Sequence, residues 1–373
     1  MNIIQLRAAA ASGELPKIAR TRYINNHIHT THSFSPYTPA DAVYTAYMSG
    51  LCTAGIMDHD TVSGAREFIE AGGLLGMPVT VGVECRVDMK NTPFSGRRIN
   101  NPDQNSCAYV AMHCIPHQHI EAVDAWFAPY RAARGVRNRA MCKVINNLVP
   151  SALAIDYDSD VLPLSVSAVT ERHILFALTH KITNLYPAPE DALRCLKADL
   201  GLDITAKAEK NILAGRETPQ FYEYDILGVL KSSLVEKFYI DATGELPDVR
   251  DFIAMVHKFD GLAAYAYLGD VGDSVTGDKR AQKFEDDYLD ALMDELKALG
   301  FDAVTYMPTR NTPAQLDRVM RLCEKRGFMQ ISGEDINSPR QSFVCPAYDD
   351  PKFAHLIDAA FALIERENRL TTI

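Results

Sequence analysis

Two histidines separated by one residue, His27 and His29, give the strongest chemical signal in the sequence. They end a short apolar run, and residues two apart in a strand point to the same face. Their imidazoles can therefore converge on one metal ion, as zinc sites require. The same pair could line the inside of a barrel without a metal, and the spacing alone leaves both interpretations open.

Ionisable residues also follow two further apolar runs. Asp58, His59 and Asp60 come directly after the run at 53–57, where charged groups are costly unless they are exposed or take part in chemistry. A solvated loop is the alternative for these three. Glu84 closes the next run, and its carboxylate could bridge two cations or form a salt bridge at the strand end.

Histidine and carboxylate candidates recur later in the chain. His113 ends a further apolar run, and His117 and His119 follow closely. We expect at least one of these three to be a metal ligand. Asp335 follows the last apolar run, and we expect its neighbour Glu334 to be solvated. Ligands of the His and carboxylate type suit zinc, manganese or iron.

Seven short apolar runs alternate with amphipathic helical stretches. Such runs fit buried parallel strands, and the alternation predicts an α/β fold, a TIM-like barrel of seven strands. In a parallel barrel the carboxyl ends of the strands meet at one edge, the mouth, so the candidate ligands would converge there. The runs span 23–29, 53–57, 79–84, 108–113, 262–267, 303–307 and 328–332.

The alternation stops between about residues 120 and 250, where one helical pattern follows another. We interpret this stretch as a helical insertion between the fourth and fifth strands. The predicted division is a first barrel part at 1–120, an insertion at 121–250 that caps the mouth, and a second barrel part at 251–373. The helices expected in the insertion span 121–134, 138–148, 172–181, 189–200 and 226–238.

Composition excludes several classes of protein. The chain has 373 residues, 38 Lys and Arg against 48 Asp and Glu, and a formal net charge of −10, which disfavours binding to a nucleic-acid polymer. No run reaches the roughly eighteen apolar residues of a membrane span. The eight cysteines lack a C-x-x-C pattern, and no signal peptide is evident, so we expect reduced thiols and a cytoplasmic location. The sequence does not determine the oligomeric state.

Taken in order, the motifs resemble the PHP (polymerase and histidinol phosphatase) superfamily of metal-dependent phosphoesterases, which have a distorted (β/α)7 barrel. The resemblance extends over about 23–341. His-Ile-His-Thr at 27–30, Asp-His-Asp-Thr at 58–61 and Gly-Val-Glu at 82–84 are similar to the first three motifs of the family. Gly-Glu-Asp-Ile-Asn at 333–337 is similar to its terminal Gly-Ser-Asp-x-His. Glu-Arg-His-Ile at 171–174 resembles the Gly-Arg-Pro-His of the stand-alone phosphatases with a helical insertion.

The chain also departs from the family pattern. Phe34 and Ser35 stand where the family has an acidic or histidine ligand, Tyr267 replaces a ligand histidine, and Asn337 replaces the last one. The resemblance implies one firm divalent-metal site and a weaker second one. Substitute ligands are expected among Tyr267, Asn337 and His117. The implied ligands are His27, His29, Glu84 and Asp335 in the first site, Glu84 and His113 in the second, and His59 in a third.

The function implied is hydrolysis of a small phosphate monoester, for instance a nucleotide, by a metal-dependent phosphatase. Arg172 is the expected phosphate contact, His173 a second contact or proton donor, and Asp58 a group that orients a ligand histidine. Two alternatives are an amidohydrolase-like metal hydrolase and a non-catalytic protein that binds a metal or a phosphorylated ligand. We expect no membrane partner.

Overall fold

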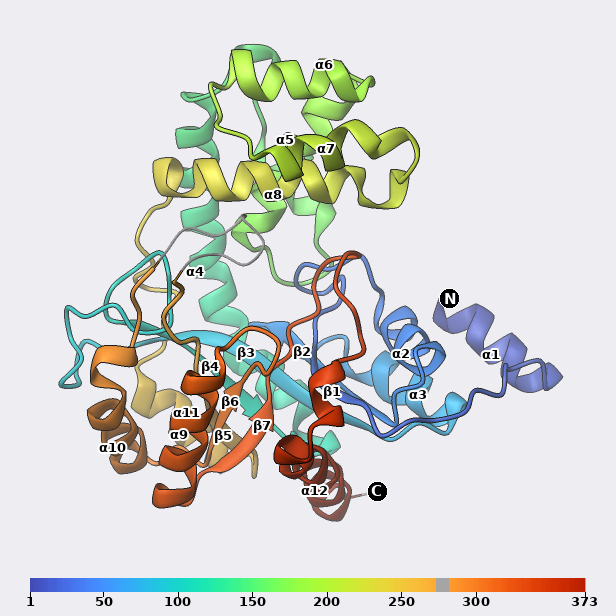
Figure 1. Cartoon of the computed structure of the whole chain (residues 1–373), viewed down its shortest axis with the longest axis vertical. Helices are drawn as coiled ribbons and strands as arrows, with labels where there is room; N and C mark the ends of the chain where they lie inside the picture. The colour runs from blue at the N-terminus through green and yellow to red at the C-terminus, as the bar shows by residue number, and fades with distance from the viewer. Residues whose placement is uncertain (273–281, 373) are drawn as a thin grey trace.

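The computed structural model describes residues 1–272 and 282–372. Seven strands form one sheet in sequential order, and the sheet curls until Ile28 bridges to Ile336, which nearly closes the barrel (Figure 1). The α/β barrel predicted from the alternation is confirmed. The strands are β1 (Ile24–Ile28), β2 (Thr53–His59), β3 (Val79–Asp88), β4 (Cys107–His113), β5 (Leu262–Ala266), β6 (Ala303–Tyr306) and β7 (Met329–Ser332).

One strand contradicts the expectation of parallel pairing throughout. β4 runs antiparallel to both β3 and β5. The reason lies in residues 89–106, which join β3 to β4 without a helix, whereas a parallel return needs a crossover connection. The end of β4 therefore lies away from the mouth, with His113 paired to Leu262 at the start of β5.

Helices surround the barrel, and residues that favour helix ends stand where several of them begin or end. Thr38 caps α2 by accepting a hydrogen bond from the amide of Asp41, and α11 ends at Gly327 with a φ of 66°, which glycine tolerates. The sequence pattern at 283–299 predicts a helix, and α10 forms only from Leu289 onward. These helices are α1 (Ile3–Ser12), α2 (Pro39–Met48), α3 (Ala65–Leu75), α9 (Val249–Lys258), α10 (Leu289–Leu299), α11 (Pro313–Arg326) and α12 (Ala354–Leu370).

The insertion between β4 and β5 has a hydrophobic core of its own, in which one barrel residue, Phe34, is included. Two helices predicted at 121–134 and 138–148 are one continuous helix, α4, although it contains Pro129. Figure 1 shows α4 rising from the barrel into the insertion. The helices are α4 (Ile120–Asn146), α5 (Glu171–Leu185), α6 (Pro189–Arg194), α7 (Ala206–Leu213) and α8 (Pro219–Phe238).

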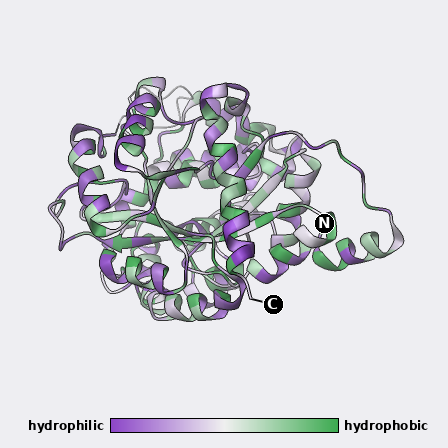
Figure 2. Ribbon diagram, turned by 90° about the horizontal axis from the view of Figure 1, so that it is seen from below, coloured by the Kyte–Doolittle hydropathy of each residue, from purple (hydrophilic) through white to green (hydrophobic). Residues whose placement is uncertain are grey.

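The end of the barrel opposite the mouth, here called the floor, is closed by α12. Leu363 packs with barrel-lining residues such as Ala264 and Ala303, and Cys114 donates to the carbonyl of Leu363. No described helix is long and apolar enough to cross a membrane. Figure 2 shows polar and apolar residues interleaved along the helices around the barrel.

Candidate metal centre

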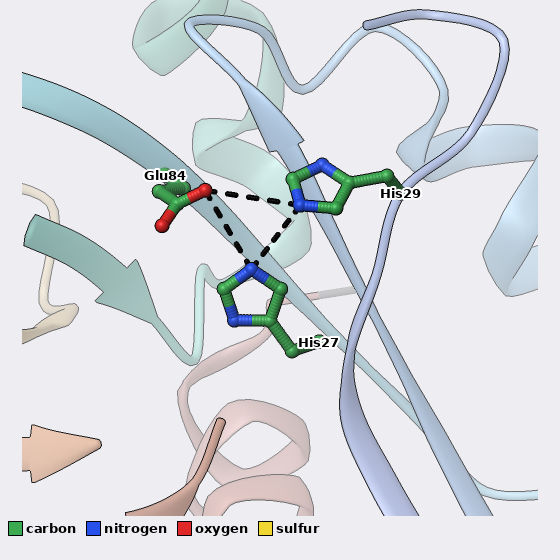
Figure 3. Close-up of side chains that lie close together, drawn as sticks. All are labelled: His27, His29 and Glu84. Atoms are coloured by element: carbon green, nitrogen blue, oxygen red, sulfur yellow. Dashed lines mark hydrogen bonds and ion pairs between the residues drawn. The ribbon is translucent and has the colours of Figure 1, made fainter. Parts of the chain in front are cut away.

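Three side chains from two strands meet inside the mouth. The Nε2 atoms of His27 and His29 lie 3.2 Å apart, and the Glu84 Oε2 atom lies 3.6 Å from the first and 3.7 Å from the second (Figure 3). His27 and His29 come from β1 and its end, and Glu84 comes from β3. All three side chains are buried. The structure thus brings together three of the four ligands expected for the first metal site.

The fourth expected ligand, Asp335, lies beside this group. Its Oδ1 atom is 3.3 Å from the Nε2 atom of His29. The amide nitrogen of Asn337 donates to both carboxylate oxygens of Asp335, at 2.6 and 2.7 Å. In this arrangement Asn337 holds a ligand in place, whereas the family pattern predicts it as a substitute ligand.

His59 completes the cluster from the end of β2. Its Nδ1 atom lies 3.1 Å from the Glu84 Oε2 atom, and its ring centroid is 4.6 Å from that of His29. His59 therefore contacts the same carboxylate oxygen that faces His27 and His29. The structure does not place it in a separate third site.

The donor set and its spacing fit a divalent cation. Zinc bonds of about 2.0–2.1 Å in a tetrahedral arrangement put neighbouring donor atoms about 3.3 Å apart. The distances of 3.2, 3.6 and 3.7 Å among His27, His29 and Glu84, and of 3.3 Å between His29 and Asp335, are close to that value. Two imidazoles and two carboxylates are also ligands that zinc, manganese and iron accept.

Burial and close charges perturb the groups of the cluster. Burial by itself lowers the pKa of His27, but the carboxylate of Glu84 acts in the opposite sense and the pKa is raised. Burial and the neighbouring His29 hold the pKa of His59 well below its ordinary value. Burial favours the neutral form of Asp335, yet the adjacent His29 and His27 hold its pKa below the usual range.

Asp58, expected to orient a ligand histidine, lies under the loop that follows β1. Its carboxylate is fully buried and accepts hydrogen bonds from the amide and hydroxyl of Thr30 and from the hydroxyl of Ser33, at 2.7, 2.6 and 2.6 Å. Ser33 Oγ lies 3.3 Å from the Nδ1 atom of His29. Because the Ser33 hydroxyl donates to Asp58, it accepts from His29 Nδ1–H, which leaves the Nε2 lone pair directed at the cluster. No local pattern in the sequence points to Ser33.

Arg172 and His173 begin α5, in the insertion. The charge of Arg172 is among the causes, after burial and the nearest groups, of the perturbed pKa values of His59 and Asp335. No hydrogen bond or ion pair joins Arg172 to another described residue. The Nδ1 atom of His173 accepts from the amide of Thr170, at 3.0 Å, and burial lowers the pKa of His173 to about 3. His173 is therefore neutral at pH 7, with its proton on Nε2.

Three residues considered as ligands lie elsewhere. His113 is buried at the reversed end of β4, and its Nε2 atom has no hydrogen-bond partner among the described residues. His117 lies at the floor, 3.0 Å from Glu367, so the expectation that it substitutes for a ligand is wrong. Tyr267 follows β5 and donates to Asp286 at 2.6 Å; burial raises its pKa, so it does not offer a phenolate to the cluster.

Comparisons with known proteins agree on the fold. No protein-family model matches the chain, and no curated protein matches it. A solved structure of a candidate metal-dependent phosphoesterase from Bifidobacterium adolescentis is 20% identical, with a TM-score of 0.57 over 90% of this chain and 97% of that one. An amidohydrolase from Chromobacterium violaceum, solved with bound sulfate and no metal, is 15% identical, with a TM-score of 0.56 over 89% and 96%. At these identities the likeness establishes a shared fold.

Proposed function

We propose that the chain is a metal-dependent phosphoesterase of the PHP type that hydrolyses a small phosphate monoester. The observation that carries this proposal is the convergence of His27, His29 and Glu84, with Asp335 beside His29, together with the charge of Arg172, which is unpaired among the described residues and acts on His59 and Asp335. A free guanidinium beside a metal centre is suited to an anionic substrate, because its paired donors match phosphate oxygens.

The residues of this chain divide the work as follows. A divalent ion held by the four ligands would activate water and polarise a phosphoryl oxygen. Arg172 binds the phosphoryl group and stabilises the charge that builds on its oxygens during transfer. Asp58 keeps His29 in the required tautomer through Ser33. We propose zinc, manganese or iron as the ion, and one ion per chain.

His173 has a narrower role in this proposal than the sequence suggested. A histidine with a pKa of about 3 is neutral at pH 7 and does not serve as a general acid there. Its Nδ1 atom is already engaged by Thr170. His173 can offer only the Nε2 proton as a hydrogen bond to substrate, so the proton for the leaving group comes from elsewhere.

A second candidate function is hydrolysis of a C–N bond, as in amidohydrolases. It is favoured by one specific observation, the likeness of the fold to an amidohydrolase structure. The same ligands would serve that reaction, since it also needs an activated water. Arg172 then has no phosphate to bind, so the two functions differ in what they expect of this residue.

Metal analysis and a substrate panel test the proposal together. We expect about one equivalent of Zn, Mn or Fe per chain and turnover of p-nitrophenyl phosphate but not of amide substrates. Asp335→Asn should remove both metal and turnover, whereas Asp158→Asn, an exposed control in the insertion, should change neither. Turnover of amides alone would favour the second candidate. Metal binding without turnover of any substrate would favour a non-catalytic binding protein.

A further inference from the structure

Six charged side chains form a buried network where the insertion meets the barrel. Three arginines interleave with three carboxylates, so the formal charges balance. The arginines are 5, 6 and 8% exposed, and such burial is unfavourable unless each charge has close partners. The members are Arg86 from β3, Arg134 and Arg137 from α4, Asp60 after β2, Glu171 from α5 and Glu245 between α8 and α9.

Glu171, like Glu245, contacts all three arginines of this network, and it is the carboxylate that belongs to α5. Arg134 Nη2 lies 2.8 Å from its Oε2 atom, Arg137 Nη2 contacts its Oε1 atom, and Arg86 Nη2 lies 3.4 Å from Oε1. Burial raises the pKa of Glu171, but the three guanidinium groups hold it well below its ordinary value. Glu171 is therefore charged over the working pH range, and its position is fixed from several directions.

The network also reaches the strands that carry the metal cluster. Asp60, which is paired with Arg134, follows His59 directly, and its amide donates to the carbonyl of Glu84 at 2.9 Å. Arg86 lies two residues beyond Glu84 in β3. The same ion pairs thus connect the first residue of α5 with the backbone of two residues in the cluster.

We propose that Glu171 is the positioning residue for Arg172, an inference that rests on the phosphoesterase function proposed above. Glu171 is the first residue of α5, and Arg172 is the second. Because the carboxylate of Glu171 is fastened to arginines of α4 and β3, the first turn of α5 cannot rotate without breaking those ion pairs. Arg172 has no described partner of its own, so the position of its backbone is set by the ion pairs of its neighbour Glu171.

The arrangement accounts for two features together. An arginine without a partner would sample many rotamers and orientations unless its backbone were fixed. Glu171 supplies that fixed backbone without contacting the guanidinium of Arg172, which stays available to an anion. The resembled family has glycine at this position, so the device belongs to this chain and is not implied by the family motif.

A double-mutant cycle tests whether Glu171 acts through Arg172. The four proteins are the wild type, Glu171→Gln, Arg172→Ala and the double variant, each assayed as the full chain for p-nitrophenyl phosphate turnover and for metal content. We expect Glu171→Gln to lower kcat/KM about tenfold in the wild type and less than about twofold when Arg172 is already alanine. Metal content should stay the same in all four. An equal loss in both backgrounds would overturn the proposal.

Glu245→Gln is the matched control for a merely structural role. It removes the same charge from the same three arginines, Arg86, Arg134 and Arg137, but Glu245 is far from Arg172 in the chain. We expect it to lower the melting temperature and to reduce kcat/KM by the same factor in both backgrounds. If the loss of kcat/KM caused by Glu245→Gln depended on the presence of Arg172 as strongly as the loss caused by Glu171→Gln, the assignment would be contradicted. If Glu171→Gln does not fold, Glu171→Asp, which keeps the charge on a shorter side chain, replaces it in the cycle.

The affinity of the same four proteins for inorganic phosphate is also measured by calorimetry, which does not depend on turnover. An inactive wild-type protein that still binds phosphate through Arg172 would refute the proposed function but leave the positioning role open to the same measurement. Active wild-type protein with independent effects of the two substitutions would refute only the positioning role. The two failures are therefore distinguishable.

Discussion

The ring of Phe34 packs edge-on against the imidazole of His173, with their centroids 5.0 Å apart and their planes at 85°. Phe34 belongs to the barrel, yet it is buried in the core of the insertion together with Phe176 and Tyr224. At this position the resembled family has a metal ligand. In this chain an aromatic contact between barrel and insertion takes the place of a coordinating group.

Shortening Phe34 tests the strength of this contact. Phe34→Ala should reduce the free energy of unfolding by about 3 kcal/mol, because it leaves a cavity beside His173. Phe34→Leu, which retains most of the volume, should reduce it by less than about 1.5 kcal/mol. Urea unfolding measures both. Metal content should be unchanged in both variants, and loss of metal in Phe34→Leu would contradict the assignment of Phe34 to packing alone.

Replacing Asp58 should weaken metal binding without removing a ligand. Asp58→Asn replaces one of the two acceptor oxygens by an NH2 group, which faces a donor of Thr30 or Ser33, so the loop that orients His29 loses one of its two acceptors. We expect a 10- to 100-fold loss of metal affinity, of the order found for partners of ligand histidines. Competition with a chelator of known affinity measures it. Ser33→Ala removes only the link to His29 and should give a smaller loss in the same direction.

Glu285 should make stability fall as pH rises. It is fully buried, and burial raises its pKa from 4.5 to about 7. Between those values the folded chain keeps a proton that the unfolded chain has released, so the folded state loses stability with increasing pH. Above pH 7 the free energy of unfolding is lower by about 3 kcal/mol than below pH 4.5, because each unit of pKa shift contributes about 1.4 kcal/mol.

Glu285→Gln should remove this dependence. A glutamine oxygen can accept from the amides of Leu268 and Gly269 as the Oε1 atom does, and its amide nitrogen takes the place of the Oε2 atom, which has no described partner. We expect the variant to be up to about 3 kcal/mol more stable than the wild type at pH 8 and similar to it at pH 5. Thermal unfolding at the two pH values measures the change. A variant that is less stable at pH 8 would contradict the pKa shift.

Replacing His117 tests whether it stabilises the floor through Glu367 without binding the metal. His117→Ala removes the ion-pair partner of Glu367, which stays bonded to Thr80 and to the amide of Val81. We expect a loss of about 1–3 kcal/mol in stability and no change in metal content. Denaturant unfolding and elemental analysis give the two values. A variant that has lost metal would return His117 to the set of ligands.

Much of the fold could be predicted because buried strands appear in the sequence as short apolar runs. All seven apolar runs correspond to strands, and Thr38 and Gly327 mark helix ends as their residue types suggest. The reversal of β4 could not be predicted, since an apolar run has the same pattern in either direction. The continuity of α4 could not be predicted either, because the predicted break at 135–137 contains Gly135, a residue that disfavours helix and is nevertheless helical here.

The cluster could be predicted in part for a related reason. His27, His29, Glu84 and Asp335 are recognisable because each is a polar residue at or just beyond an apolar run. Tyr267 follows a run too, but its side chain bonds to Asp286, and no local pattern indicates that orientation. The ion pairs of Glu171 join residues far apart in the chain, and neither spacing nor composition shows such contacts.

The reversal of β4 determines how the chain must connect the barrel to the insertion. The chain leaves β4 at the floor, although the insertion lies beyond the mouth, so a long connection must climb the full height of the barrel. Helix α4 provides this connection, because its 27 residues rise 1.5 Å each and make a helix about 40 Å long. Arg134 lies midway along this helix and pairs with Asp60 after β2, so α4 is fastened to the barrel well above its first turn, and the orientation of the insertion is set there.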